Sequence, residues 1–174
     1  PLNDGLAQGQ PQPGAALTVL AVTLKHVWQQ IGGDARAADV VADLAVLVID
    51  INEGLKPQTI ESISILKRFK TPFIIAMNKI DLLEGWQTSP NKPFILSYKE
   101  QAEEARAKLD ERMYKIIGDL YEKGYSADRY DRIEDFTKAI AIVPISARNG
   151  EGLPDLLLVL IGLAQRFLEE SLKT

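Results

Sequence analysis

The sequence predicts an α/β domain with a mostly parallel sheet of about four strands, covered by helices on both faces. Apolar runs typical of buried strands alternate with longer segments in which apolar residues recur at helical spacing. Strands separated by helices form βα units, and strands that are apolar on both faces need a helix layer on each side. The 174 residues, 46% of them apolar, suffice for one domain with a sizeable core.

Four apolar segments carry the strand prediction. Leu44–Ile51 (LAVLVIDI) is apolar on both faces and therefore suits a parallel sheet that helices cover on both sides. Ala15–Thr23 is continuously apolar and partly β-branched, which favours a buried strand. The predicted strands are Ala15–Thr23, Leu44–Ile51, Pro72–Met77 and Ile140–Ile145.

Helical segments are expected between and after these strands. Pro57 fits the first turn of one helix, whose buried stripe is formed by Ile60, Ile63, Leu66 and Phe69. The expected helices are Lys25–Ala42 with a break at Gly32–Gly33 and a cap at Asp34, Pro57 to about Lys70, roughly Tyr98–Lys123, and Gly152 to about Leu172. Leu82–Ser97 is expected to be a loop, and Tyr125–Phe136 to be irregular.

Composition excludes several classes of protein and site. The net charge of −4 gives no sign of a broad nucleic-acid-binding surface. The absence of cysteine excludes disulfides and thiolate metal sites and fits the reducing cytoplasm. Leu156–Ala164, the longest apolar run, is shorter than the roughly 20 residues that cross a bilayer, so no membrane partner is expected. Pro1–Gly14 is rich in Pro, Gly and Gln and is expected to be a flexible lead-in.

Polar residues at two predicted strand ends indicate guanine recognition. Asn78–Asp81 (NKID) directly follows the third strand, and Ser146-Ala147 directly follows the fourth. Ligands of parallel α/β sheets bind outside these carboxyl ends. The Asp81 carboxylate can accept the N1–H and N2–H donors of guanine together, a charge-assisted pair of bonds that adenine cannot match.

The neighbouring residues have complementary expected roles. Asn78 would tie the two loops together and hold the base edge, and the aliphatic stem of Lys79 would cover one face of the ring. The backbone N–H of Ala147 would donate to guanine O6, with Ser146 bracing its loop. The alternative is that NKID is only a polar turn at a strand end. Its pairing with the Ser146-Ala147 end favours the functional interpretation.

Three longer stretches resemble a known family. They are ADLAVLVIDINEGLKPQTIESISILKRFKTPFIIAMNKIDLLEGW, YEKGYSADRYDRIEDF and AIVPISARNGEGLPDLLLVLIGLAQRFLEE. They resemble the G domain of the translation initiation factor two family, in its archaeal and eukaryotic factor-five-B branch, from Ala42 to about Leu172. The resemblance implies a three-layer P-loop GTPase-type fold, a guanine nucleotide ligand, GTP-dependent action and the ribosome as partner.

The resemblance does not extend to the phosphate-binding motifs. The chain contains no Gly-Lys dipeptide, so it lacks the G-x-x-x-x-G-K-[ST] loop that holds phosphates and Mg²⁺. The nearest match to the family's Asp-Thr-Pro-Gly-His motif is Val22–His26, which keeps the Thr and the His but has Val22 in place of Asp and Lys25 in place of Gly. GTP or GDP binding is therefore expected to be weak, Mg²⁺ binding is not expected, and no catalytic residue is assigned.

Three polar residues near these motifs have a structural alternative. His26 could orient an attacking water, but without the Asp and Gly of the motif a polar residue early in a helix is the favoured interpretation. Asp50 and Asn52 are interpreted as a strand-end turn rather than as catalytic groups.

The missing phosphate-loop strand has a consequence for the sheet. In this fold class that strand lies beside the equivalent of Leu44–Ile51, whose backbone groups would otherwise stay unpaired. Residues 15–174 are expected to form one domain, in which 15–41 are unrelated to the family and 42–174 are the C-terminal part of the G domain. Ala15–Thr23 is expected to fill the vacancy in a four-stranded parallel sheet, and as an apolar edge it favours a homodimer.

Three functions remain open at this point. The first is a working GTPase of the initiation-factor type. The second, which the residues favour, is a guanine-nucleotide-binding domain that retains base recognition and has lost hydrolysis. The third is a truncated or engineered chimeric scaffold that folds but binds no nucleotide.

Overall fold

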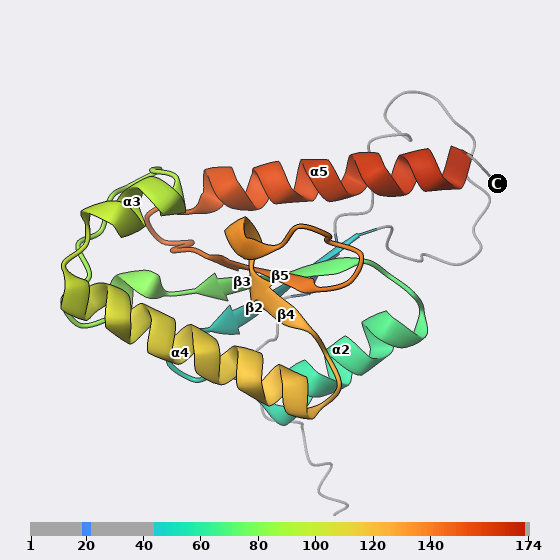
Figure 1. Ribbon diagram of the computed structural model, residues 1–174, viewed down its shortest axis with the longest axis horizontal. Coiled ribbons are helices and arrows are strands. Elements are labelled where there is room, and N and C mark those ends of the chain that lie inside the picture. Colours follow the sequence, from blue (N-terminus) through green and yellow to red (C-terminus); the bar gives the residue numbers. More distant parts are fainter. Residues whose placement is uncertain (1–18, 22–43, 173–174) are drawn as a thin grey trace, which may run out of the picture.

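The computed structural model describes residues 19–21 and 44–172, which contain a five-stranded sheet with helices on both faces (Figure 1). The strand order is β1-β2-β3-β5-β4. The strands are β1 (Val19–Ala21), β2 (Ala45–Asp50), β3 (Phe73–Asn78), β4 (Ala127–Arg129) and β5 (Ile140–Pro144). The helices are α2 (Pro57–Arg68), α3 (Phe94–Glu100), α4 (Glu103–Glu122) and α5 (Leu153–Leu172), with short 3₁₀ turns at Ile80–Leu82 and Tyr130–Arg132.

The parallel centre of the sheet confirms the predicted α/β fold class. Strand β2 pairs in parallel with β3, with Ala45 opposite Phe73 and Asp50 opposite Asn78. Strand β3 pairs in parallel with β5, and β5 with β4. Every residue of β5 is buried, which agrees with a strand that carries a helix layer on each face.

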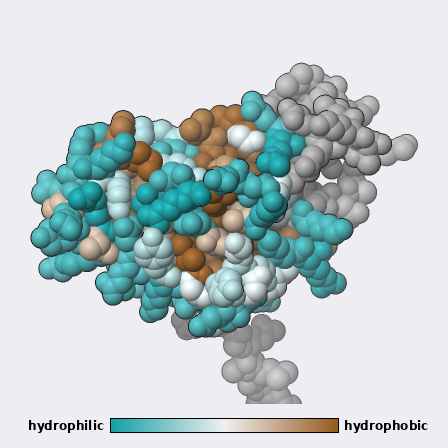
Figure 2. All heavy atoms as spheres, in the orientation of Figure 1, coloured by the Kyte–Doolittle hydropathy of each residue, from teal (hydrophilic) through white to brown (hydrophobic). Residues whose placement is uncertain are grey.

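Two apolar cores lie on opposite faces of this sheet. Alternate residues of β2 separate them: Leu47 faces the core beneath α2 and α4, and Val46 faces the core beneath α5. Helix α4 contributes Ala105, Leu109, Met113, Ile116 and Leu120, which recur every three or four residues. Helix α5 contributes Val159 and Leu163 on the other face, and further apolar side chains of this helix reach the surface (Figure 2).

The predicted stripe of α2 is correct except at its last member. Ile63 is fully buried, and Ile60 and Leu66 pack against the core. Phe69 is 60% exposed, because α2 ends at Arg68 and Phe69 occupies the C-cap position beyond the last turn. A residue past the end of a helix no longer follows the helical stripe.

Strand β1 corrects the prediction of a purely parallel sheet. Val19–Ala21 pairs with β2, as expected for the segment Ala15–Thr23, but the pairing is antiparallel, with Val19 opposite Leu47 and Ala21 opposite Ala45. Either direction satisfies the backbone groups of β2, and a short apolar run carries no signal for one of them. The sheet therefore has four parallel strands and one antiparallel edge strand. The homodimer through this edge stays a prediction.

The structure differs from the sequence prediction in two further places. Ala127–Arg129, expected to be irregular, forms strand β4 at the other edge of the sheet. The helix expected at Tyr98–Lys123 is two helices, separated at Gln101 and Ala102, and the first of them begins at Phe94, inside the segment expected to be a loop. The Gln101 backbone is extended, and its side-chain amide accepts from the Gln87 N–H at 2.7 Å and donates to the Gln87 carbonyl at 2.8 Å. The chain leaves the helix there because these bonds to the preceding loop hold it.

Several predictions lie outside the described residues. They are the flexible lead-in at Pro1–Gly14, the helix at Lys25–Ala42 with its cap at Asp34, and the placement of Thr23–His26. Within the part of the chain that the structure describes, no helix is long and apolar enough to cross a membrane.

Candidate guanine-binding site

Two loops meet where β3 and β5 end. Strand β3 ends at Asn78, and the backbone then turns at Lys79, whose φ of 72° lies in the left-handed region. The Ile145 N–H donates to the Met77 carbonyl at 2.8 Å, and the Ile80 N–H donates to the Ile145 carbonyl at 3.3 Å. These bonds extend the ladder beyond the strands and bring the NKID loop beside the Ser146 turn.

Asn78 joins the two loops through its side chain. Its Oδ1 accepts the backbone N–H of Ala147 at 2.9 Å and the backbone N–H of Lys79 at 2.8 Å. One amide oxygen therefore fixes the turn on its own loop and the turn on the neighbouring loop. The Ala147 N–H, which the sequence analysis assigned to guanine O6, has Asn78 as its partner in this structure.

Lys79 lies across the ends of β2 and β3. Its Nζ is 2.7 Å from Asp50 Oδ2, and half of its side chain is exposed. Partial burial acts to raise the pKa of Asp50, but the hydrogen bond from Lys79 and the N–H of Asn52 outweigh it, and the pKa lies below its usual value. The same hydrogen bond raises the pKa of Lys79. Lys79 is thus a fixed cation whose stem remains accessible.

Asp50 also closes the turn that follows β2. Its Oδ1 accepts the Asn52 N–H at 2.8 Å, and its backbone carbonyl accepts the N–H of Glu53 at 3.2 Å and of Gly54 at 2.9 Å. These contacts agree with the interpretation of Asp50 and Asn52 as a strand-end turn. They also give Asp50 a second task, which is to hold Lys79.

Asp81 is the second residue of the 3₁₀ turn Ile80–Leu82 and is partly exposed. Among the described residues, no donor lies within hydrogen-bonding distance of its carboxylate. A carboxylate in the first turn is favoured by the N–H groups there and keeps both oxygens for a ligand. The structure therefore places Asp81, Asn78 and Ala147 at one end of the sheet, with acceptor capacity at Asp81.

Ser146 braces the second loop from a fully buried position. Its N–H donates to the Glu151 carbonyl at 2.9 Å, its carbonyl accepts the Gly150 N–H at 2.8 Å, and its Oγ accepts the Asn149 N–H at 3.3 Å. The turn from 146 to 151 is therefore closed on itself by three bonds. Such closure limits the freedom of the Ala147 N–H, which lies inside the turn.

Glu151 is a site-supporting residue that the sequence analysis did not assign. Its side chain is fully buried. Its Oε1 accepts Trp86 Nε1–H at 3.2 Å and the Ser97 hydroxyl, and its Oε2 accepts the Ser89 N–H at 3.3 Å. Three donors compensate the loss of water around this carboxylate. Glu151 therefore holds the long loop after β3 against the back of the Ser146 turn.

Two glycines flank Glu151, and this Gly-Glu-Gly pattern is the sequence feature that could have predicted a tight turn at this position. Gly150 and Gly152 both have φ of 75°, a backbone conformation that other residues rarely adopt. A Cβ at Gly150 would lie 2.2 Å from Asn91 Oδ1, and one at Gly152 would lie 2.3 Å from the Pro144 carbonyl. The Gly-Glu-Gly sequence thus marks a turn that packs tightly against two other segments.

The described residues offer no metal-binding cluster. No group of three or more His, Asp or Glu side chains in 19–21 and 44–172 is arranged to hold a metal ion. Val22–His26, the only approach to the family's phosphate-sensing motif, lies outside those ranges. At the ends of β3 and β5 the described residues instead offer the Asp81 carboxylate and the Ala147 N–H as hydrogen-bonding groups.

Comparison with known proteins identifies the family. The family profile described as "Elongation factor Tu GTP binding domain" matches residues 33–166. The chain belongs to this family. The match begins slightly upstream of Ala42, where the sequence resemblance begins, and it includes both loops of the candidate site.

Archaeal initiation factors are among its similar relatives. A "Probable translation initiation factor IF-2" from Methanocella arvoryzae is 59% identical over 133 residues, which are 76% of this chain and 22% of that protein. One from Archaeoglobus fulgidus is 55% identical over 138 residues, 79% of this chain and 23% of that protein. These findings confirm the resemblance to the archaeal branch of the initiation factor two family.

A solved structure supports the same assignment. The crystal structure of GDP-bound aIF5B from Aeropyrum pernix matches with a TM-score of 0.74 and 50% identity, over 78% of this chain and 23% of that chain. This likeness confirms the P-loop GTPase-type α/β fold. The chain spans less than a quarter of the length of these relatives.

Proposed function

We propose that this chain is the base-recognising part of a guanine-nucleotide-binding domain of a cytoplasmic translation initiation factor of the IF-2/aIF5B kind. The observation that carries the proposal is the 2.9 Å bond from Ala147 N–H to Asn78 Oδ1, which joins the NKID loop to the Ser146 turn. The similar aIF5B structure is described as GDP-bound, and the matching family profile is named for GTP binding.

In the proposed complex the Asp81 carboxylate accepts N1–H and N2–H of guanine. The Ala147 N–H is shared between Asn78 Oδ1 and guanine O6 as a three-centre bond, a common arrangement at turns. The stem of Lys79, held at its end by Asp50, covers one face of the ring. Adenine would leave the Asp81 carboxylate without its two donors, so the site would discriminate against it.

Affinity is expected to be low, because the chain lacks the Gly-Lys phosphate loop. Charge-assisted bonds of the kind that this loop makes to phosphate contribute roughly 1.5–3 kcal/mol each. Losing several of them moves a dissociation constant by many decades. We therefore expect GDP binding in the millimolar range and no turnover of GTP. The ribosome is the partner that the family resemblance implies.

Calorimetric titration of the full chain with GDP and with ADP tests this proposal. Guanine-selective binding that disappears in Asp81→Ala and persists in Glu111→Ala, an exposed acid on α4, would support it. Single-turnover assays with GTP are expected to release phosphate no faster than the uncatalysed reaction. Equal binding of GDP and ADP would contradict guanine recognition. Phosphate release above the uncatalysed rate would contradict the loss of hydrolysis.

A second candidate is a folded scaffold that binds no nucleotide. The observation in its favour is the antiparallel pairing of β1 with β2, which departs from the parallel pairing expected if Ala15–Thr23 replaced the phosphate-loop strand. The same titration separates the two, since a scaffold shows no heat of binding at millimolar GDP while remaining folded by circular dichroism.

A further inference from the structure

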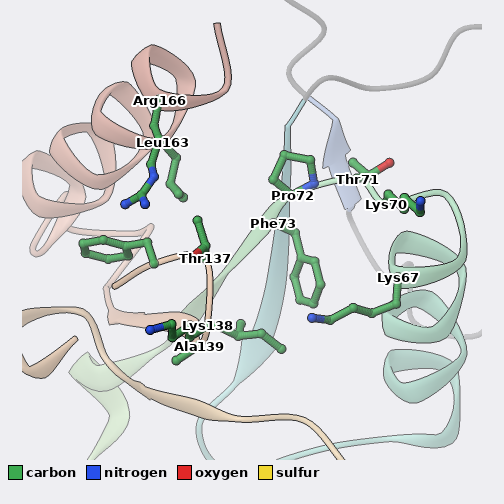
Figure 3. A pocket seen from close by; sticks show the side chains of 12 residues that line it. Lys67, Lys70, Thr71, Pro72, Phe73, Thr137, Lys138, Ala139, Leu163 and Arg166 are labelled. Atoms are coloured by element: carbon green, nitrogen blue, oxygen red, sulfur yellow. The ribbon is translucent and has the colours of Figure 1, made fainter. Parts of the chain in front are cut away.

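A cleft of about 500 Å³ opens at the end of the sheet opposite to the candidate guanine site, where β3 and β5 begin (Figure 3). It is formed by the end of α2, the starts of β3 and β5, and the middle of α5. Strand β3 starts at Phe73 in the cleft and ends at Asn78 in the candidate guanine site. At about 3.3 Å per residue the two sites lie roughly 17 Å apart, so both can be occupied at once.

The charged residues that line this cleft are all cations. Lys67, Lys70, Lys138 and Arg166 belong to the lining, and no carboxylate does. The whole chain has a net charge of −4, so this concentration of positive charge runs against its average. Like charges that share a hollow repel one another, and an anion bound between them relieves that repulsion.

Aromatic and acidic neighbours position three of these cations. Lys67 Nζ lies 6.0 Å from the centre of the Phe73 ring and 5.9 Å from that of Tyr125. Asp135, just outside the lining, lies 3.6 Å from Arg166 and 3.5 Å from Lys138. Figure 3 shows Lys67 and Arg166 on opposite walls of the cleft, with the Lys67 ammonium beside the Phe73 ring.

Asp135 is held in place by its own hydrogen bonds, so it can position the two cations without preventing them from binding an anion. Its Oδ1 accepts the Thr137 N–H at 3.0 Å and the Thr137 hydroxyl at 2.6 Å. One carboxylate engaged in this way cannot neutralise two cations, and exposed pairs at these distances are weak. Among the described residues, neither Lys67 nor Lys70 has a carboxylate within 4.0 Å.

The uncharged part of the lining is largely apolar and partly aromatic. Phe136 is half-buried, and the lining also contains Pro72, Ala139 and Leu163. Cations beside apolar and aromatic side chains match a ligand in which phosphates alternate with planar bases. An acidic peptide would satisfy the cations but offers no planar group for the aromatic side chains. A volume of about 500 Å³ is in the range of small-ligand pockets and suits about one nucleotide of a strand. A base can stack on an aromatic side chain only where it is not already paired and stacked in a duplex, which favours a single strand.

We propose that this basic cleft binds the phosphate backbone of a single-stranded nucleic acid, with Lys67, Lys138 and Arg166 contacting phosphates and Phe136 supporting a base. The proposal is independent of guanine-nucleotide binding, because the two sites share no residue.

Fluorescence anisotropy with a labelled 12-nucleotide oligouridylate tests the proposal on the full chain. This probe contains no guanine, so saturating GDP is expected to leave its binding unchanged. Three phosphate contacts predict that log affinity falls with log salt concentration with a slope of about −2. Lys67→Ala and Lys138→Ala are each expected to weaken binding about 3- to 5-fold, as for one exposed ion pair, and to flatten the slope by about 0.7.

Lys115→Ala is the matched control, since Lys115 is exposed on α4, away from the cleft. The proposal stands if Lys115→Ala binds as the parent chain does while the two cleft variants bind more weakly. It is overturned if all three variants lose affinity equally, or if the parent chain shows no binding at 50 mM salt. It is also overturned if oligoglutamate of equal charge displaces the probe as well as unlabelled oligouridylate does, because the cleft would then select an acidic peptide.

Discussion

Replacing Glu151 by glutamine is expected to destabilise the fold while changing almost no volume. The Glu151 carboxylate is fully buried and accepts from Trp86 Nε1–H, the Ser97 hydroxyl and the Ser89 N–H. Glutamine keeps one carbonyl oxygen and replaces the other by an NH₂ group. That NH₂ faces a donor, so either the Ser89 N–H or the Trp86 Nε1–H is left without a partner.

The magnitude follows from the number of donors lost. One buried donor left unpaired costs about 1–3 kcal/mol, and we take ~2 kcal/mol. For a domain of this length, each kcal/mol shifts the melting temperature by about 2–4 °C, so Glu151→Gln is expected to melt about 4–8 °C lower. With a urea dependence of about 2 kcal/mol per molar, the unfolding midpoint falls by about 1 M.

Urea unfolding followed by circular dichroism measures this change. Glu111→Gln is the control, because Glu111 is exposed on α4 and its substitution is expected to move the midpoint by less than about 0.25 M, or 0.5 kcal/mol. A Glu151→Gln midpoint that coincides with the control would refute the reasoning. It would show that the three donors do not depend on two acceptor oxygens at this position.

Two further predictions concern Gly152 and Asp50. Gly152→Ala places a Cβ 2.3 Å from the Pro144 carbonyl at a φ of 75° and is expected to lower the free energy of unfolding by more than about 2 kcal/mol. Gly162→Ala, on α5 with open space around its Cβ, is expected to raise that free energy by up to about 1 kcal/mol. Equal shifts of the melting temperature in the two variants would contradict this prediction. The pKa of Asp50 is lowered by folding, so the stability that its charge contributes is fully present above the unfolded pKa near 3.8 and is lost as pH falls through the folded value. The difference in unfolding free energy between the parent chain and Asp50→Asn is therefore expected to be measurable at pH 6 and to shrink by pH 3, and a difference that does not change with pH would count against the ion pair with Lys79.

Apolar patterning carried most of the fold prediction. Continuous apolar runs located β2, β3 and β5, because strands buried on both faces exclude polar residues. The direction of β1 could not be found in this way, since three apolar residues pair equally well in either sense. Strand β4 was missed because its sequence, Ala-Asp-Arg, is polar, and Arg129 becomes buried only by pairing with Asp131 at 2.5 Å and stacking on Tyr98.

The residues of the candidate site that directly follow strands could be predicted from the sequence. The buried residue that holds the loops in place, Glu151, could not. Asn78 and Ala147 were expected to lie close together because the carboxyl ends of neighbouring parallel strands lie at the same end of the sheet. The 2.9 Å bond from Ala147 N–H to Asn78 Oδ1 joins the two loops there. Glu151 was not assigned, because its partners Trp86, Ser89 and Ser97 lie more than 50 residues earlier in the chain. Contacts over such separations are set by packing of the whole domain, on which local patterns carry no information.

The central claim is that Asp81 reads the N1–H and N2–H donors of guanine. Xanthine carries a carbonyl where guanine carries its N2 amine, so Asp81→Asn, which offers an N–H donor, should suit xanthine better. The measurement is an NMR titration of the parent chain and of Asp81→Asn with GDP and with xanthosine diphosphate. We predict that the parent chain favours GDP by at least about 10-fold, or ~1.4 kcal/mol, and that the variant reverses this order. The same order of affinities in both proteins, or no binding of GDP by the parent chain at millimolar concentration, would contradict the account.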